Sequence, residues 1–268
     1  DILAGFVLTP NALAVSDVSA QAKKFMVIMN AAASIITPKS DYSTRVSLTL
    51  PQVAESLGTW AHKSGIRKTY TMVSDFGPGH DAEGGFHRAF KAAGGEIIGS
   101  VRFPIANPDF SAFVQRAKDT NPECIYIFIP GGAQPAALGK AFAERGIDLN
   151  KTKVLGSGET TAEQALKVMG DAGLGIISAW HYDYKSNAPK NVELVKIFNE
   201  MHGRNPDFFS IGGYDGMHAI YETLKKTGGK TDADALVAAA KGLKWDSPRG
   251  PIWIDPEARD IVETIYIR

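Results

Sequence analysis

Short apolar runs rich in β-branched and aromatic residues alternate along the chain with longer amphipathic segments, and this alternation restricts the possible fold most strongly. Several short runs are apolar without interruption, which is typical of strands buried on both faces of a parallel sheet. We predict strands over residues 2–8, 25–29, 69–74, 97–103, 124–129, 154–157, 175–179 and 262–267. Repeated alternation of strand and helix favours an α/β fold whose parallel sheets are flanked by helices.

The longer segments place apolar residues three or four positions apart, as in Phe86, Ala89 and Phe90, which predicts helices with one buried face. Several of them stop at a glycine, such as Gly65 or Gly146, as helices commonly do. The predicted helices cover residues 12–23, 50–64, 81–93, 109–120, 135–145, 161–169, 190–201, 213–227 and 232–242.

Composition excludes several classes of partner. The 268 residues carry 29 basic and 29 acidic side chains, so the formal net charge is zero. A balanced charge argues against a broad surface for nucleic acid or for an anionic membrane. The single cysteine, Cys124, lies in an apolar run and cannot form an intramolecular disulfide, so we expect a buried and unreactive thiol.

A glycine-containing stretch after the strand at 69–74 matches a nucleotide-binding pattern. The sequence GPGHDA, which begins at Gly77, fits G-x-G-x-x-G/A. However, Pro78 removes one of the N–H groups that would meet a pyrophosphate, and Asp75 and Asp81 add negative charge on either side. We therefore interpret the stretch as a β-to-α turn, and an NAD(P)-dependent enzyme is the least favoured function.

No set of side chains with the spacing of a catalytic or metal site is present. The six histidines include no H-E-x-x-H motif and no pairing with Cys124 at metal-ligand spacing. No G-x-S-x-G nucleophile elbow occurs either. The sequence thus predicts no catalytic residues, no metal and no cofactor, and favours a protein that is not an enzyme.

Four segments carry a resemblance to a known family. Residues 74–99 contain the end of a strand with Asp and an aromatic-Gly-x-Gly turn, and residues 107–132 contain an Asp-Phe-Ser helix start followed by a strand and Gly-Gly. Residues 214–229 form a helix that begins with Tyr-Asp-Gly, and residues 250–267 begin with Gly-Pro and form the closing strand. Their content, order and spacing resemble the type I periplasmic solute-binding proteins, in the leucine/isoleucine/valine-binding branch of ABC importers. The resemblance covers nearly the whole chain.

This resemblance implies two α/β lobes joined by three crossovers, with a ligand held in the cleft between them by hinge closure. The crossovers would fall near residues 45–49, 180–184 and 245–250. The first lobe would comprise residues 1–47 with 185–246, and the second lobe residues 48–180 with 249–268. Because the family begins with further strands and helices, we expect the N-terminal part of the first lobe to be absent from this sequence.

Ligands of open α/β sheets bind at the carboxyl ends of the strands, which directs attention to the loops after each predicted strand. The resemblance implies the same loops. In the first lobe, Thr9 and Asn11 match positions that hold a ligand carboxylate. The next loop matches a segment whose backbone N–H and C=O groups contact the ligand carboxylate and ammonium. Its residues are Asn30, Ala31, Ala32 and Ala33. A helix start rich in alanine is the alternative interpretation of this loop.

In the second lobe, Phe76 matches an aromatic residue that covers the ligand. Glu159 lies near the position of an acid that pairs with a ligand ammonium, a charge-assisted contact, although it could instead cap the following helix. Gln134 and Trp180 are further pocket candidates, and Trp180 could equally pack against a crossover.

Together these features predict an extracytoplasmic solute-binding subunit that captures an amino acid or a small carboxylate, aromatic acids included. Its partners would be that small ligand and the membrane permease of an ABC importer, with no role for nucleic acid. We expect a periplasmic location, or lipid anchoring outside a Gram-positive cell, and a signal peptide in the precursor. An intracellular ligand-sensing regulator built on the same fold is the main alternative.

Overall fold

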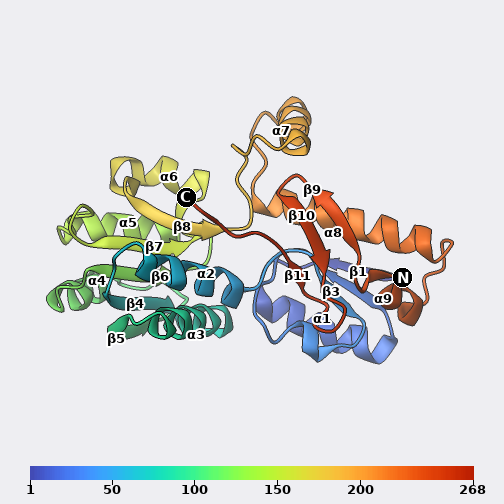
Figure 1. The fold of residues 1–268 in the computed structure, drawn as a ribbon, viewed down its shortest axis with the longest axis horizontal. Helices are drawn as coiled ribbons and strands as arrows, with labels where there is room; N and C mark the ends of the chain where they lie inside the picture. The colour runs from blue at the N-terminus through green and yellow to red at the C-terminus, as the bar shows by residue number, and fades with distance from the viewer. The chain divides into compact units, whose positions relative to one another are not determined.

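The computed structural model describes residues 1–268 and divides them into two compact units. Unit 1 comprises Asp1–Thr49 and His181–Tyr266, and unit 2 comprises Leu50–Trp180 and Ile267–Arg268. The chain therefore passes between the units after residues 49, 180 and 266. Both units contain a parallel sheet with helices packed against it, as the alternating sequence predicts (Figure 1).

Unit 2 is built on a six-stranded sheet in the order β12-β8-β7-β6-β4-β5. Strands β4 to β8 pair in parallel through four adjacent contacts. The strands are β4 (Lys68–Ser74), β5 (Glu96–Phe103), β6 (Cys124–Phe128), β7 (Lys153–Ser157), β8 (Ile176–Trp180) and β12 (Tyr266–Ile267). All five residues of β6 are buried, which explains its uninterrupted apolar sequence.

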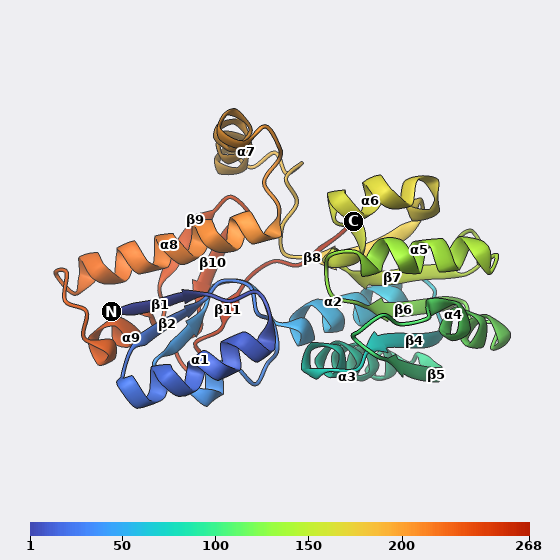
Figure 2. The same ribbon diagram turned by 180° about the vertical axis from the view of Figure 1, so that it is seen from behind.

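The helices of unit 2 connect these strands and cover both faces of the sheet. They are α2 (Leu50–Lys63), α3 (Gly77–Ala92), α4 (Phe110–Asp119), α5 (Gln134–Glu144) and α6 (Glu163–Met169). Helices α2 and α3 lie side by side (Figures 1 and 2). On their face Phe86 stacks on Tyr126, with ring centroids 4.1 Å apart. On the opposite face Ile125 and Ile127 pack with residues of α4 and α5.

The order of the strands in unit 2 contains a switch point. Helix α3 leads from β4 to β5 on one side of β4, whereas α5 leads from β6 to β7 in the other direction. Because crossovers between parallel strands are right-handed, α3 and α5 cover opposite faces of the sheet. In open α/β sheets, ligands bind at the carboxyl ends of the strands where the direction changes, and in unit 2 these are the ends of β4 and β6.

Unit 1 contains two small sheets. One is parallel, with the order β1-β2-β3, and the other is antiparallel, with the order β11-β10-β9. The strands are β1 (Ile2–Gly5), β2 (Phe25–Ile28), β3 (Ser43–Arg45), β9 (Lys244–Ser247), β10 (Gly250–Ile254) and β11 (Ile261–Val262). The helices are α1 (Thr9–Ala22), α7 (Pro189–His202), α8 (Phe208–Lys226) and α9 (Ala233–Ala240).

Strand β2 forms the centre of unit 1, and its four residues are all buried. Phe25 and Val27 pack with residues of α8 and α9, while Met26 and Ile28 pack with residues of α1 and the loop after β2. Because successive side chains of a strand point to opposite faces, β2 contributes to the apolar layers on both faces of the sheet. Strand β1 pairs with β2 only, so it lies at an edge of the sheet.

The structure corrects the assignment of the end of the chain. The sequence reasoning places residues 249–268 in the second lobe and a crossover near 245–250, but residues 249–266 belong to unit 1. The reason is an antiparallel hairpin, in which β10 pairs with β9 and then with β11. The single strand predicted at 262–267 is accordingly two short strands, β11 in unit 1 and β12 beside β8.

Candidate ligand-binding site

Two aromatic rings meet at the switch point of unit 2. Phe76 is the second residue after the end of β4, and Phe128 is the last residue of β6. Their ring centroids lie 6.1 Å apart with an interplanar angle of 31°. Phe76 is partly exposed, whereas Phe128 is buried at 2 % exposure. Phe76 was predicted from the sequence, but its partner Phe128 was missed because it is one residue of a uniformly apolar run.

The glycines after Phe76 belong to the first turn of α3 rather than to a loop. The helix begins at Gly77, four residues before the predicted start, with Pro78 in its first turn where a missing N–H costs nothing. A Cβ atom at Gly79 would lie 1.8 Å from the carbonyl oxygen of Ser74. Gly79 therefore lets the helix start rest directly on the end of β4, which is a packing role and not a phosphate cradle.

The carboxyl end of β7 carries Glu159 and meets Trp180 of β8. Gly158 begins the short helix η2 (Gly158–Thr161), and a Cβ there would lie 2.1 Å from Cγ of Trp180. The Trp180 side chain is therefore packed against the backbone of this turn, and it is only 1 % exposed. This position supports a packing role for Trp180 against the turn at Gly158, and its role as a ligand contact stays a prediction.

Glu159 is partly buried, and its Oε2 atom has no hydrogen-bond partner in the protein. The adjacent Thr160 hydroxyl is buried and lacks a partner as well. Burial raises the pKa of Glu159 to about 7, while the Ser157 hydroxyl, the residue's own backbone and the Arg268 charge oppose the shift. The side chain makes no ion pair. A buried polar atom without a partner costs about 1–3 kcal/mol, so such an atom at a strand end indicates a place for a ligand.

Gln134 is the first residue of α5, at the loop that follows β6. Its Nε2 donates a hydrogen bond of 2.6 Å to the carbonyl oxygen of Ile105, in the segment after β5. The amide group thus joins two loops at the same end of the sheet. Its Oε1 is buried without a partner, so it stays a candidate contact.

In unit 1, Thr9 opens helix α1 at the carboxyl end of β1. The side chain is 5 % exposed, and its hydroxyl has no hydrogen-bond partner. Residue Leu8 occupies the N-cap position and provides no side-chain cap for the first N–H groups. These groups and the positive end of the helix dipole attract anions. Asn11 lies exposed in the same first turn.

The loop after β2 contains the other predicted residues of unit 1, and they differ in environment. Ala31 and Ala33 are fully buried within an apolar cluster. Their carbonyl oxygens accept hydrogen bonds of 2.9 and 2.8 Å from the guanidinium of Arg45, and the Ala31 N–H donates to Phe6. Asn30 and Ala32 are partly exposed, and Oδ1 of Asn30 has no partner. Asn30 and Ala32 are thus better placed than Ala31 and Ala33 to contact a ligand.

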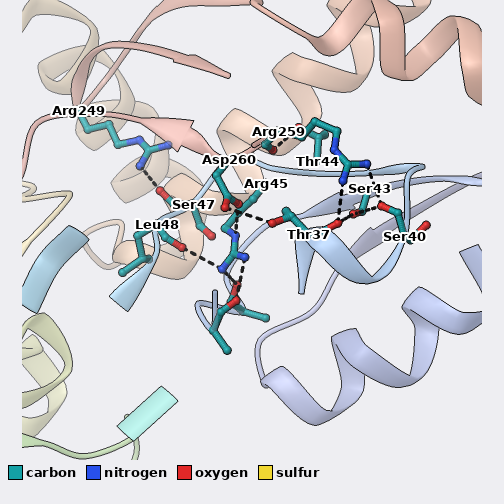
Figure 3. Close-up of polar contacts among 12 residues, drawn as sticks. Thr37, Ser40, Ser43, Thr44, Arg45, Ser47, Leu48, Arg249, Arg259 and Asp260 are labelled. Atoms are coloured by element: carbon teal, nitrogen blue, oxygen red, sulfur yellow. Dashed lines mark hydrogen bonds and ion pairs between the residues drawn. The ribbon is translucent and has the colours of Figure 1, made fainter. Parts of the chain in front are cut away.

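Figure 3 shows how Arg45 supports this loop from inside unit 1. The Arg45 side chain is fully buried, and its Nε lies 2.8 Å from Oδ1 of Asp260. Asp260 also accepts a hydrogen bond from the Thr37 hydroxyl at 3.1 Å. A buried guanidinium with several acceptors orients the backbone around it. No local pattern in the sequence indicates this role, because Arg45 and Asp260 are 215 positions apart.

Helix α8 lies against the end of β2 through its glycines. A Cβ at Gly212 would lie 2.2 Å from the carbonyl oxygen of Met29, and one at Gly216 would lie 2.4 Å from Cε of the same residue. Asp215, between them, is fully buried and accepts hydrogen bonds from Trp245 at 2.9 Å and Arg249 at 2.8 Å. The Tyr-Asp-Gly motif therefore has a structural role in unit 1.

No group of three or more histidine, cysteine, aspartate and glutamate side chains has the arrangement of a metal site. Cys124 is buried, as predicted. No helix has both the length and the apolar character that a membrane crossing demands.

Comparisons with known proteins identify a family that matches the whole chain. Residues 1–268 match the family described as periplasmic binding protein. The Leu/Ile/Val-binding protein homolog 6 of Brucella melitensis biotype 1 is 41 % identical over 269 residues, which cover 99 % of this chain and 69 % of that protein.

Two solved structures are solute-binding proteins of ABC transporters from Rhodopseudomonas palustris. The one from strain BisB5, in complex with 3,4-dihydroxybenzoic acid, has a TM-score of 0.94 and 48 % identity, over 100 % of this chain and 73 % of that one. The one from strain HaA2, in complex with p-hydroxybenzoic acid, has a TM-score of 0.95 and 38 % identity over the same shares of the two chains.

Proposed function

Because the chain belongs to the periplasmic binding protein family, as a solute-binding protein of an ABC transporter, we propose that its ligand is a small aromatic carboxylate. The sequence alone left amino acids and small carboxylates open. Within that class, the residues at the strand ends of each unit favour an aromatic carboxylate. Capture by hinge closure, as the resemblance implies, is part of the proposal.

The aromatic pair Phe76 and Phe128 carries the proposal. The partly exposed ring of Phe76 offers an apolar surface at the strand switch point, where an α/β sheet binds its ligand, and the buried ring of Phe128 supports it from 6.1 Å away. Aromatic rings favour offset or edge-to-face contact with another ring, worth about 0.5–1.5 kcal/mol beyond the burial of area. The matched proteins of R. palustris, which carry hydroxylated benzoic acids, support the same choice.

We assign the carboxylate of the ligand to unit 1. The uncapped first turn of α1 supplies N–H donors, and the unpartnered hydroxyl of Thr9 supplies an O–H donor. The side-chain amide of Asn30 can supply a third donor. A carboxylate accepts several hydrogen bonds at once, and charge makes each of them stronger than a neutral bond.

An amino-acid ligand is the second candidate, because Glu159 could pair with an ammonium group. The name of the Brucella relative, a Leu/Ile/Val-binding protein homolog, favours this possibility. An amine would meet Glu159 in its ionised form, and the cost of burying that charge would be offset by the ion pair.

We further propose that the protein acts in the periplasm or on the outer surface of the cell and delivers its ligand to a membrane permease. The proposed location and the proposed permease partner both follow from membership in the family and not from any surface of this chain. A signal peptide in the complete gene would support this location over the alternative of an intracellular regulator.

Titration calorimetry of the purified protein with benzoate, 4-hydroxybenzoate, phenylalanine and leucine tests the ligand class. We expect an aromatic acid to bind most tightly. Phe76→Ala should weaken that binding by about 10- to 100-fold through lost ring contact and burial. Phe209→Ala is the matched control, because Phe209 is an exposed phenylalanine of α8 in unit 1. Tighter binding of leucine, or no effect of Phe76→Ala, would contradict the proposal.

A further inference from the structure

Glu159 is distinguished from the other acidic residues near the strand ends of unit 2. Asp75 forms a contact of 2.7 Å with His80, and Glu83 forms an ion pair of 2.7 Å with Arg102. Glu159 has no such cation, and its Oε2 has no hydrogen-bond donor. Glu159 is therefore the acidic side chain of these three that keeps a buried carboxyl oxygen without a hydrogen-bond partner.

The nearest positive charge does not satisfy this group. Arg268 opposes the pKa shift of Glu159, but its guanidinium donates elsewhere, at 3.2 Å to the Ser178 hydroxyl and at 3.5 Å to the Gly158 carbonyl. The surroundings of Glu159 are instead aromatic and neutral. The Trp180 ring packs against Gly158, and burial raises the pKa of the Tyr126 phenol with a further contribution from the charge of nearby Glu159.

A carboxyl group in such a place favours a neutral donor. Burial without an ion pair makes the ionised form of Glu159 unfavourable, and its pKa is raised accordingly, although the charge of Arg268 opposes the shift. A phenolic hydroxyl can donate to a carboxyl oxygen without bringing a second charge out of water. An ammonium could also bind there, but it would have to lose its hydration among aromatic rings.

We infer that Glu159 determines ligand specificity in the proposed site, by accepting a hydrogen bond from a ring hydroxyl of the aromatic acid. The inference rests on the proposed function and adds to it the ligand class, which is hydroxylated aromatic acids. Unsubstituted benzoate would leave the carboxyl oxygen unpartnered in the complex. A binding site that holds a buried hydrogen-bonding group discriminates strongly against analogues that lack the matching group.

Calorimetric titration with benzoate, 3-hydroxybenzoate, 4-hydroxybenzoate and phenylalanine tests the inference. For the unaltered protein we expect at least one hydroxybenzoate to bind about 10-fold or more tighter than benzoate, as one satisfied hydrogen bond predicts. In Glu159→Leu this ratio should fall to about one, because Leu offers no acceptor. In Glu159→Gln the amide oxygen still accepts, so the ratio should be largely retained.

Glu163→Gln provides the matched control. Glu163 is an acid four residues further along that pairs with Lys167 at 2.9 Å, and its removal should leave the ratio unchanged. The ratio measured on the unaltered protein keeps the test decisive even if Glu159→Leu does not fold. Equal affinities for benzoate and both hydroxybenzoates would overturn the inference and leave the proposed function intact. Tightest binding of phenylalanine, abolished in Glu159→Gln, would overturn both in favour of an ammonium at Glu159.

Discussion

The contact between Gly79 and Ser74 allows a sharp test of why glycines follow β4. In Gly79→Ala, the new Cβ would lie 1.8 Å from the Ser74 carbonyl oxygen, whereas ordinary contacts begin at 3.4 Å. Because the obstacle is backbone, no side-chain rotation can relieve it, and the helix start or the strand end must shift by more than about 1.5 Å. Overpacking of this kind costs up to about 3 kcal/mol.

Gly77→Ala is the matched comparison in the same turn. A Cβ at Gly77 meets nothing within 4 Å, and its φ lies outside the range that favours glycine. Loss of flexibility in the unfolded chain should leave this variant unchanged or more stable by up to about 1 kcal/mol. The two substitutions add the same methyl group two residues apart, so their difference isolates the contact with Ser74.

Thermal unfolding followed by circular dichroism measures both variants. For a unit of this size about 1 kcal/mol shifts the Tm by roughly 3–4 °C, so Gly79→Ala should lower it by about 10 °C. Gly77→Ala should change it by less than about 3 °C in either direction. Equal shifts for the two variants would refute the conclusion that Gly79 is required by close packing on the end of β4.

Three further predictions concern buried groups. Gly158→Ala should destabilise the protein by about 1–3 kcal/mol, because the new Cβ would lie 2.1 Å from the buried ring of Trp180. Urea unfolding measures this effect, and an unchanged midpoint would contradict the close packing of Trp180 on Gly158. Burial raises the pKa of Glu263 to about 8 against the opposing charge of Arg249, so the folded state binds this proton more tightly than the unfolded state does. The stability of the folded state should therefore fall as pH rises from about 4.5 to 8. Urea unfolding midpoints measured across this range should fall less in Glu263→Gln than in the unaltered protein. Identical pH profiles for the two proteins would count against a raised pKa of Glu263. Cys124 is fully buried with a raised pKa, so a thiol reagent should label it only on unfolding, and rapid labelling of the native protein would disprove this.

Much of the fold was accessible from local patterns. The uninterrupted apolar run of β6 and the amphipathic spacing of α3 each reflect one segment's own burial, so periodicity predicts them. The start of α3 was predicted four residues late, because Gly77 and Gly79 were assigned to a loop. A proline at the second position of a helix and a glycine in close contact give the same sequence pattern as a turn.

The candidate site was predictable to the extent that it depends on strand ends. Phe76 and Glu159 follow β4 and β7, and the rule that ligands bind beyond carboxyl ends identifies such loops from the sequence. The rule says nothing about which groups in a loop are already bonded. Ala31 and Ala33 share a loop with Asn30, yet both of their carbonyls are bonded to Arg45.

Local sequence patterns are sufficient to predict the α/β class, the family resemblance and most of the loops proposed to contact a ligand, because each depends on residues close together in the chain. The folded chain adds that β10 pairs within unit 1, that Phe128 is the partner of Phe76, and that Arg45 supports the loop after β2. The contacts of Phe128 and Arg45 join residues tens to hundreds of positions apart, and they depend on burial and charge pairing that local periodicity does not record.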